Sequence, residues 1–249
     1  RWYAHERAAA ANADAYRTGS SALAGLVATH FGIDRECIPV IRNPVDTRVF
    51  DTIGRRQMKG DSFEMLFVGR LEGRKGAQLL VEALPSLLRL DPRINVTFAG
   101  EIQLGESTSY REAIERVLDD DQRMRVWFPG PVNRLELPVM YCNSQLLLLP
   151  SLFDNSPNTL LEAMAARLPV LASDAGGINE IITDNRNGLL FEPRETDSFL
   201  EKAAWAVQHY PRMTEMADVA YCDARTNHSP DRIADQTLDY YRKLVERRR

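Results

Sequence analysis

The fold follows from residues 150–180, which read PSLFDNSPNTLLEAMAARLPVLASDAGGINE. An apolar run at 146–149 ends at a proline, a polar loop carrying Asp154 follows, and a helix is expected to begin near Pro157. Residues 170–172 then read as a second buried strand. This order of strand, loop, helix and strand is typical of a parallel α/β sheet, in which ligands bind beyond the carboxyl ends of the strands.

The start of this helix is expected to bind an anion. Ser156 is placed as the N-cap and Pro157 as the first helical residue, because both residue types are favoured at those positions. The backbone N–H groups of Asn158, Thr159 and Leu160 would then face the loop, where a helix N-terminus carries a partial positive charge. A phosphate group fits there.

Two carboxylates, Asp154 and Glu162, flank the helix start. One is on the loop and the other lies about a turn and a half into the helix, so both can face one cleft. Carboxylates accept hydrogen bonds from vicinal hydroxyls, which suits a ribose or another sugar. The alternative is that Asp154 caps the loop and Glu162 is a solvated helix position, and the pair alone does not decide between these interpretations.

A second segment, residues 64–88, places basic side chains at a strand-to-helix turn. A buried strand at 64–68 precedes the turn GRLEGRKG at 69–76, and apolar residues then recur at helical spacing. Arg70 and Lys75 put cations where a diphosphate needs them. The order fits neither a P-loop nor a dinucleotide fingerprint, and taken alone the turn is also compatible with an ordinary basic surface loop.

Together these motifs resemble the C-terminal half of a retaining GT-B glycosyltransferase of the large family four, the "glycosyl transferases group 1". The resemblance runs from about Ala13 to about Tyr241 and implies an α/β fold with a Rossmann-like doubly wound parallel sheet. It rests on four segments in a fixed order: GRLEGRKG at 69–76, VWFPGPVNRLELPVMY at 126–141, PSLFDNSPNTLLEAMA at 150–165 and PVLASDAGGINEII at 169–182.

The resemblance implies catalytic roles for four residues. Arg70 and Lys75 match a basic pair that neutralises the donor diphosphate and stabilises the departing nucleoside diphosphate, on which charge grows in the transition state. Asp154 and Glu162 match two acids, of which the second holds the nucleotide ribose and the first lies near the transferred sugar. Asp154 stands where glutamate is usual and reaches one methylene less.

Further donor-binding positions follow from the same resemblance. A glycine loop lies along the donor and is followed by an acid, another stretch of backbone meets the base, and the helix N-terminus faces the phosphates. The implied set is Gly69, Gly130, Pro131, Val132, Asn158, Thr159, Leu160, Gly176, Gly177 and Glu180. Neither a metal ion nor another cofactor is implied, because the nucleotide sugar is a substrate.

Four parts are expected along the chain. They are the end of an N-terminal Rossmann-like domain at 1–50, a polar linker at 51–62, the nucleotide-sugar-binding domain at 63–226 and, at 227–249, a C-terminal helix that packs back toward the N-terminal domain. The further elements expected are helices near 8–13, 21–31, 110–118 and 135–141 and strands near 15–18, 38–41, 94–99 and 124–128. Most of the N-terminal domain, with the acceptor site, is expected to be missing, so this chain alone should bind donor weakly and transfer no sugar.

Composition favours a cytoplasmic enzyme. The hydrophobic content of 44% is enough for a core, and the net charge of −4, from 31 basic and 35 acidic residues, argues against a nucleic-acid surface. No apolar run approaches the ~20 residues that span a bilayer, and no signal peptide is visible. Cys37, Cys142 and Cys222 indicate neither a disulfide framework nor a zinc site. The basic end of the C-terminal helix leaves a peripheral contact with the inner face of the membrane as an alternative to packing.

Residues 119–121 form the one Asp-x-Asp pattern, which a metal-dependent GT-A transferase would use to hold manganese. Here the pattern is expected at the wrong end of the sheet, as a solvated turn. The four histidines show no ligand spacing either.

The function that these observations favour is retaining transfer of a hexosyl group from a UDP- or GDP-sugar to a saccharide or lipid-linked acceptor, in bacterial polysaccharide or glycolipid assembly. One alternative is a GT-B phosphorylase or epimerase. Another is a non-catalytic nucleotide-sugar-binding module that works with a partner chain.

Overall fold

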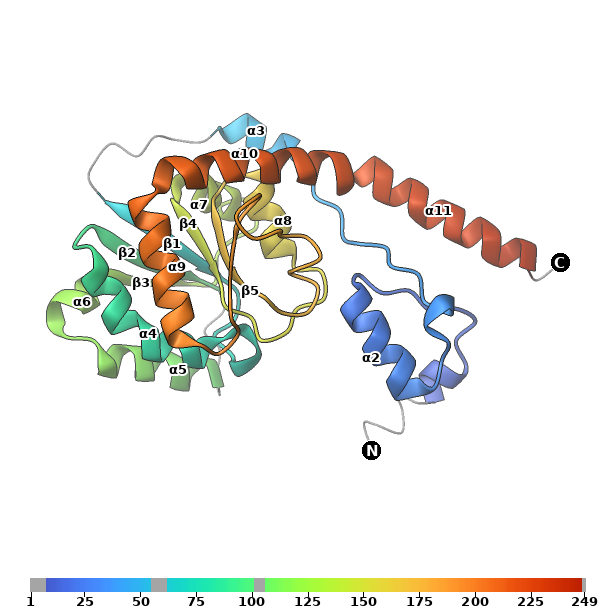
Figure 1. The fold of residues 1–249 in the computed structure, drawn as a ribbon, viewed down its shortest axis with the longest axis horizontal. Helices are drawn as coiled ribbons and strands as arrows, with labels where there is room; N and C mark the ends of the chain where they lie inside the picture. The colour runs from blue at the N-terminus through green and yellow to red at the C-terminus, as the bar shows by residue number, and fades with distance from the viewer. Residues whose placement is uncertain (1–7, 55–61, 101–105, 248–249) are drawn as a thin grey trace.

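Six parallel strands form the centre of the structure, a computed structural model that describes residues 8–54, 62–100 and 106–247 (Figure 1). The strands are β1 (Phe63–Val68), β2 (Ile94–Ala99), β3 (Val126–Gly130), β4 (Leu146–Leu149), β5 (Val170–Ser173) and β6 (Leu189–Phe191). Their order in the sheet is β3-β2-β1-β4-β5-β6, so the direction of winding reverses between β1 and β4. The doubly wound parallel sheet is confirmed, and the reversal marks where an α/β sheet of this kind binds its ligand.

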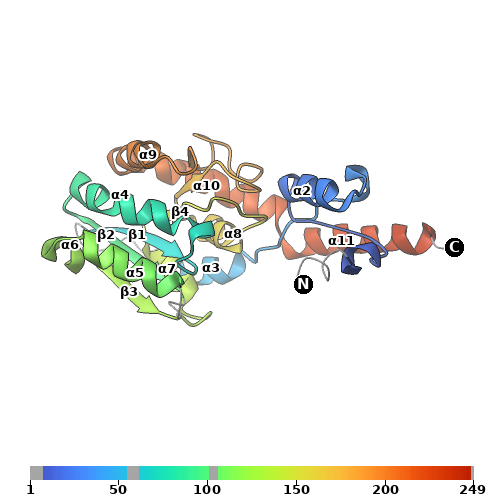
Figure 2. The same ribbon diagram turned by 90° about the horizontal axis from the view of Figure 1, so that it is seen from below.

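Helices cover both faces of the sheet (Figure 2). Those that follow the strands are α4 (Ala77–Leu90), α5 (Glu106–Val117), α6 (Asp120–Met124), α7 (Leu137–Asn143), α8 (Asn158–Ala165), α9 (Thr196–Gln208), α10 (Tyr210–Asn227) and α11 (Pro230–Arg247). The elements before β1 are α2 (Ser21–Phe31), the short 3-10 helix η1 (Arg35–Cys37) and α3 (Arg48–Ile53), and a second 3-10 turn, η2 (Gly73–Lys75), follows β1.

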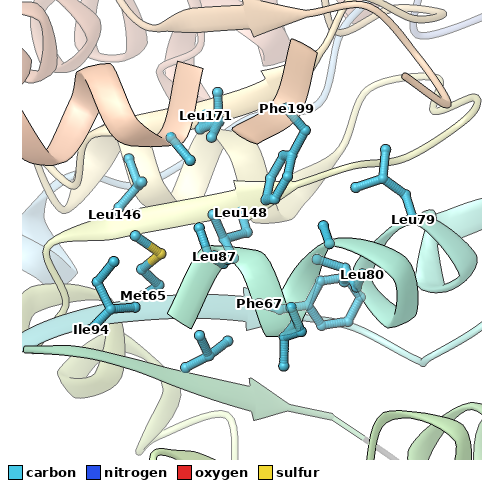
Figure 3. Close-up of a cluster of buried hydrophobic side chains, with 14 of the residues drawn as sticks. Met65, Phe67, Leu79, Leu80, Leu87, Ile94, Leu146, Leu148, Leu171 and Phe199 are labelled. Carbon is cyan, nitrogen blue, oxygen red and sulfur yellow. The ribbon is translucent and has the colours of Figure 1, made fainter. Parts of the chain in front are cut away.

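The alternation of strand side chains produces two cores. Met65 and Phe67 point to the face covered by α4, α5 and α9 (Figure 3), whereas Leu66 points to the face covered by α7 and α8. Strand β4 is buried on both faces, as expected for the centre of a parallel sheet. The apolar residues of α4 that recur at helical spacing are buried in the first core. These cores fix the strand ends from which the site loops leave.

The N-terminal segment forms a small unit beside α11. Residues 8–11 and 21–31 are helical, as predicted, but the strands predicted at 15–18 and 38–41 are reduced to one parallel bridge between Thr18 and Val40. The hydroxyl of Tyr240 on α11 donates to the carbonyl of Tyr16 at 2.7 Å, so the last helix contacts this segment. The packing of the C-terminal helix toward an N-terminal domain stays a prediction.

Other predicted boundaries were wrong by a few residues. The linker predicted from Asp51 begins inside α3, and its residues 55–61 lie outside the described residues. Strand β3 begins at Val126 rather than 124, because α6 occupies the preceding residues. Helices α5 and α7 are also displaced, running over 106–117 and 137–143.

The Asp-x-Asp pattern is solvent-exposed, as predicted, but it forms the start of α6 and not a turn. Asp119 is its N-cap, with Oδ1 accepting from the Gln122 N–H at 2.8 Å and the Gln122 side chain accepting from the Asp119 N–H at 3.3 Å. This reciprocal capping explains the position of Asp119, and the carboxylates of Asp120 and Asp121 pair with Arg123 and Arg125. In the described part of the chain, no group of three or more His, Cys, Asp and Glu residues is placed to hold a metal ion.

No helix within residues 8–54, 62–100 and 106–247 is both long and apolar enough to cross a bilayer.

Candidate functional site

The candidate site lies at the carboxyl ends of β1 and β4, which are neighbours where the winding reverses. The 3-10 turn η2 follows β1 and the loop 150–157 follows β4. The backbone N–H of Leu152 in that loop donates to the Arg74 carbonyl at 2.9 Å. Gly76 allows this approach, because it has a φ of +78° and a Cβ there would lie 1.9 Å from the Pro150 carbonyl oxygen. Gly76, the last glycine of the GRLEGRKG turn, is therefore needed for the close approach of this turn to the backbone of Pro150.

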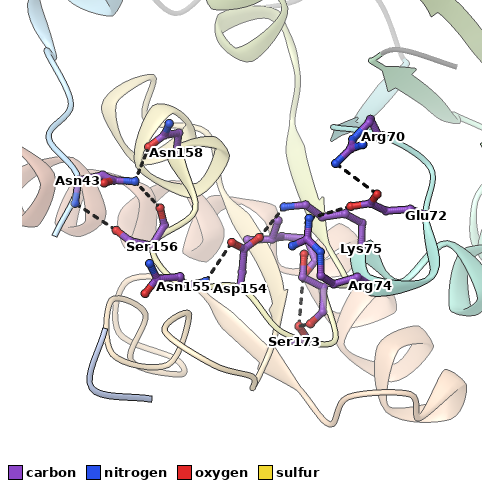
Figure 4. Close-up of polar contacts among 12 residues, drawn as sticks. Asn43, Arg70, Glu72, Arg74, Lys75, Asp154, Asn155, Ser156, Asn158 and Ser173 are labelled. Atoms are coloured by element: carbon purple, nitrogen blue, oxygen red, sulfur yellow. Dashed lines mark hydrogen bonds and ion pairs between the residues drawn. The ribbon is translucent and has the colours of Figure 1, made fainter. Parts of the chain in front are cut away.

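Lys75 and Asp154 form an ion pair at this junction (Figure 4). Nζ lies 2.5 Å from Oδ2, and the two side chains are only 16% and 13% exposed. The other oxygen of Asp154 accepts from the Asn155 backbone N–H at 3.1 Å. The structure thus brings together two predicted site residues that are 79 positions apart in the sequence.

Arg70 does not join this pair. Its side chain is 60% exposed and its guanidinium lies 3.4 Å from Glu72, which also binds Arg74 at 2.7 Å (Figure 4). Glu72 was not singled out in the sequence, because an acid between basic residues in a turn looks like ordinary surface. In this structure Arg70 is placed near the carboxyl end of β1 but is held by its own loop.

Glu162 faces a different part of the cleft. The hydroxyl of Tyr141 donates to its Oε2 at 2.8 Å. Burial raises the pKa of the Glu162 carboxyl, although the Tyr141 hydrogen bond and the charge of Arg134 act to lower it. Glu162 and Asn158 line a pocket of ≈450 Å³ whose other lining residues are Asn43, Pro44, Val45, Asp46, Val49, Phe50 and Pro138.

Asp154 is not among the residues that line this pocket. The two acids therefore make different contacts on either side of the start of α8, and the expectation that both face one cleft stays a prediction. Asp154 turns toward Lys75 on the β1 side, whereas Glu162 turns toward Tyr141 on α7.

The helix cap predicted at Ser156 was wrong by one position. Pro157 is the N-cap of α8, with an extended ψ of 119°, and Asn158 is the first helical residue. Ser156 instead accepts a hydrogen bond at Oγ from the Asn43 backbone N–H at 3.2 Å. The N–H of Leu160 donates to the Pro157 carbonyl at 3.1 Å, so it does not face the loop as predicted. The Ser156 hydroxyl, which local preference assigned to the helix cap, is instead bonded to Asn43, a residue distant in the sequence.

Gly176 and Gly177 pack against the Asp154 loop. The Gly177 N–H donates to the Asp154 carbonyl at 2.7 Å, and Gly176 has a φ of +59°. A Cβ on Gly177 would lie 1.7 Å from the Asn155 carbonyl oxygen, and one on Gly176 would lie 2.4 Å from that of Asp154. Whatever they do for a ligand, these glycines position the loop that carries Asp154.

Glu180 binds the N-terminal segment. Its carboxylate accepts from the backbone N–H groups of Ser21 and Ala22, each at 2.9 Å, and pairs with Arg42 at 3.1 Å. Burial acts to raise the pKa of Glu180, but these three donors lower it overall. Glu180 therefore caps helix α2, a role that its sequence position did not reveal because its partners lie about 140 to 160 residues away.

The remaining predicted positions lie at the carboxyl edge of the sheet beyond β1 and β3. Gly69 follows β1 with a φ of +140°, and Gly130 ends β3 with a φ of +79°. Pro131 is exposed, and Val132 packs on the second core. The structure thus groups them on the same edge as the Lys75 and Asp154 pair.

Asn43 is a further residue that sequence reasoning missed. Its carboxamide donates to the Ser156 carbonyl at 2.8 Å and to Asn158 Oδ1 at 2.9 Å (Figure 4). His228, between α10 and α11, contacts the Asn43 carbonyl through Nδ1 at 3.2 Å. Burial lowers the pKa of His228. In the sequence, Asn43 begins an Asn-Pro-Val-Asp turn at 43–46, a pattern that gives no sign of these contacts.

Comparison with known proteins identifies the family. A family model described as "Glycosyl transferases group 1" matches residues 51–221. An uncharacterized glycosyltransferase of Methanocaldococcus jannaschii is 29% identical over 245 residues, which cover 92% of this chain and 60% of that protein. This chain therefore spans less than two thirds of the length of that relative.

Solved structures show the same fold. The sucrose-phosphate synthase of Thermosynechococcus elongatus superposes with a TM-score of 0.83 at 21% identity, covering 98% of this chain and 61% of that one. Anabaena HepE in complex with UDP and glucose gives 0.81 at 22% identity, covering 93% and 64%. With the family match over residues 51–221, the conclusion is direct: the chain belongs to the glycosyl transferases group 1 family.

Proposed function

We propose that this chain supplies the donor site of a retaining glycosyltransferase, which moves a hexosyl group from a UDP- or GDP-sugar to a saccharide or lipid-linked acceptor. The observation that carries the proposal is the Lys75–Asp154 pair at the reversal of the sheet, placed between η2 and the start of α8. The pocket lined by Glu162 adjoins the same helix. HepE, a structural neighbour, was solved with UDP and glucose, which supports a nucleotide sugar as the ligand class.

The leaving group sets the role of the basic residues. Negative charge on the nucleoside diphosphate grows as its bond to the sugar breaks, so cations already in place stabilise the transition state more than the ground state. Lys75 has three donor hydrogens and can hold Asp154 while it binds a phosphate oxygen. Arg70 lies on the same turn and reaches the diphosphate once it leaves Glu72. Asp154, positioned by Gly176 and Gly177, accepts from a hydroxyl of the transferred sugar.

Glu162 serves the nucleotide. A carboxylate in a pocket of ≈450 Å³ accepts hydrogen bonds from the adjacent hydroxyls of a ribose. The base would lie toward Gly130 and Val132, at the carboxyl end of β3. The proposal includes no metal, since the cationic side chains neutralise the diphosphate, and it places the enzyme in the cytoplasm.

Isothermal titration with UDP, GDP and ADP tests the donor site. We expect one nucleotide to bind saturably, and Lys75→Ala to weaken it by about 10-fold or more because a charge-assisted hydrogen bond is lost. Lys202→Ala is the matched control, because it removes a lysine–aspartate pair, with Asp184 at 3.0 Å, outside the candidate site. Equal affinities in the two variants would contradict the role of Lys75.

The same titration separates the alternatives. Saturable binding of inorganic phosphate and a phosphate-dependent reaction without any nucleotide would favour a phosphorylase. Nucleotide-sugar binding without transfer in the full-length protein, assayed with saccharide and lipid-linked acceptors, would favour a non-catalytic module.

A further inference from the structure

Tyr141 carries a feature that family membership does not explain. It is a buried tyrosine, 1% exposed, on α7, and its hydroxyl donates to Glu162 Oε2 at 2.8 Å. The ring packs edge-on against Phe50, with centroids 6.1 Å apart and planes at 75°. The buried ring holds the hydroxyl in place, so its hydrogen bond fixes the direction of the partly buried Glu162 carboxylate.

The bond also fixes which group holds the proton. Burial raises the pKa of Glu162, which favours a protonated acid that would donate rather than accept. The Tyr141 hydrogen bond opposes this effect. Burial and the nearby Glu162 charge raise the pKa of Tyr141 well above its ordinary value, so the tyrosine keeps its proton and remains the donor.

One carboxylate oxygen is thereby left for a ligand. Oε2 is occupied by Tyr141, and from the residues that the structure describes Oε1 receives no hydrogen bond. Glu162 lines the pocket that Asn158 and the 43–46 turn also line. An ionised carboxylate has room for about four hydrogen bonds, and one internal donor leaves the rest for two ribose hydroxyls.

We propose that Tyr141 is a positioning residue, which holds Oε2 of Glu162 so that Oε1 faces the pocket and accepts from a ribose hydroxyl of the nucleotide. This inference rests on the proposed function, because it assigns the ribose to Glu162. It adds that discrimination between ribose and deoxyribose depends on a residue that does not touch the ligand.

The test is Tyr141→Phe, which removes one oxygen and keeps the ring. Tyr221→Phe is the matched control, because the Tyr221 hydroxyl also donates to a carboxylate, that of Asp51 at 2.9 Å, and neither residue lines the pocket. Titrations use UDP, GDP and ADP and their 2′-deoxy and 3′-deoxy counterparts. The Glu162 carboxyl is titrated independently by carbon-13 NMR in the absence of nucleotide.

We expect the wild type and Tyr221→Phe to bind the ribonucleotide about 10-fold more tightly than a deoxy counterpart, as for loss of one charge-assisted hydrogen bond. In Tyr141→Phe this ratio should fall toward one, and the pKa of Glu162 should rise. A merely structural role would weaken the ribo and deoxy ligands equally and leave the Glu162 titration unchanged.

The two hypotheses fail in different ways. If the wild type discriminates, Glu162→Gln removes the discrimination and Tyr141→Phe keeps it with an unchanged Glu162 titration, then the role of Tyr141 is overturned and the donor site stands. If the folded wild type binds no nucleotide, or binds ribo and deoxy forms alike, then the assignment of ribose to Glu162 fails and the inference fails with it.

Discussion

Replacing Gly76 by alanine should move the turn that carries Lys75 away from the loop that carries Asp154. The backbone of Gly76 has φ +78° and ψ +22°, in the left-handed region, and a Cβ there would lie 1.9 Å from the carbonyl oxygen and 2.6 Å from the carbonyl carbon of Pro150. Both atoms belong to the backbone, so no side chain can rotate away. The loop after β4 must move away from η2 by about 1 Å or more. In an active site, a misplacement of this size lowers the catalytic rate by about 100-fold.

Gly32 provides the matched control. It has φ +68° and ψ +34°, nearly the same conformation, yet a Cβ there meets no atom within 4 Å. Gly32→Ala should therefore cost only the left-handed strain, about 1–2 kcal/mol. Gly76→Ala should cost that strain and a further ~1–3 kcal/mol for the contact with Pro150.

Two assays measure the difference. Urea unfolding gives the free energy of unfolding of each variant, and titration with the nucleotide that the wild type binds gives the Kd. We expect Gly76→Ala to lose both stability and affinity, because Lys75 and Asp154 stand on the two segments that separate, and Gly32→Ala to keep wild-type affinity. Equal losses of stability in the two variants, or wild-type affinity in Gly76→Ala, would refute the view that this glycine sets the site.

Two further predictions concern pH. Because burial raises the pKa of Glu162, its contribution to stability is present below the unfolded pKa, about 4.3, and is lost as the pH rises through the folded pKa. Glu162→Gln should therefore resist urea better than the wild type at pH 8, lose that advantage near pH ~4, and bind nucleotide more weakly throughout; an unchanged urea midpoint at both pH values would count against a buried charge. The pKa of Glu180 is lowered, so its contribution is present above the unfolded pKa and is lost as the pH falls through the folded value. Glu180→Gln should lose about 1–2 kcal/mol at pH 7 and much less near pH ~3, as measured by urea unfolding with a probe on α2, and a pH-independent loss would contradict the capping role.

Local patterns were sufficient for the sheet and for part of the site. The apolar run of β4, the polar loop after it and the apolar spacing of α4 follow from periodicity and turn chemistry over a few residues. The carboxyl ends of adjacent parallel strands share one edge of the sheet, so the pairing of β1 with β4 explains why Lys75 and Asp154 meet, a contact that was not predicted. The features that could be predicted thus depend on residues close in the sequence.

Contacts between distant segments were not accessible in this way. Ser156 was assigned to a cap, but Asn43 is 113 residues away in the sequence and competes for the same hydroxyl. Tyr141 stood inside a segment quoted for its family resemblance, and nothing local tied its hydroxyl to Glu162. The strands predicted at 15–18 and 38–41 had suitable residues, but a strand needs partners along its whole length, and only Thr18 and Val40 pair.

The capping of α2 by Glu180 has a consequence for recombining relatives of this protein. Residues 8–42 contact the segments that follow β4 and β5. The backbone N–H groups of Ser21 and Ala22 and the side chain of Arg42 bind Glu180, and the Cβ position of Gly19 lies 2.9 Å from Ser156. A chimaera that exchanges the chain at the covalent junction near residue 50 would cut through none of these contacts yet would replace one side of all of them. The interface between the N-terminal segment and the rest of the chain therefore includes Glu180 and residues 155–156. A chimaera that exchanges the domain carrying these residues should also exchange the start of α2, so that the contacts match.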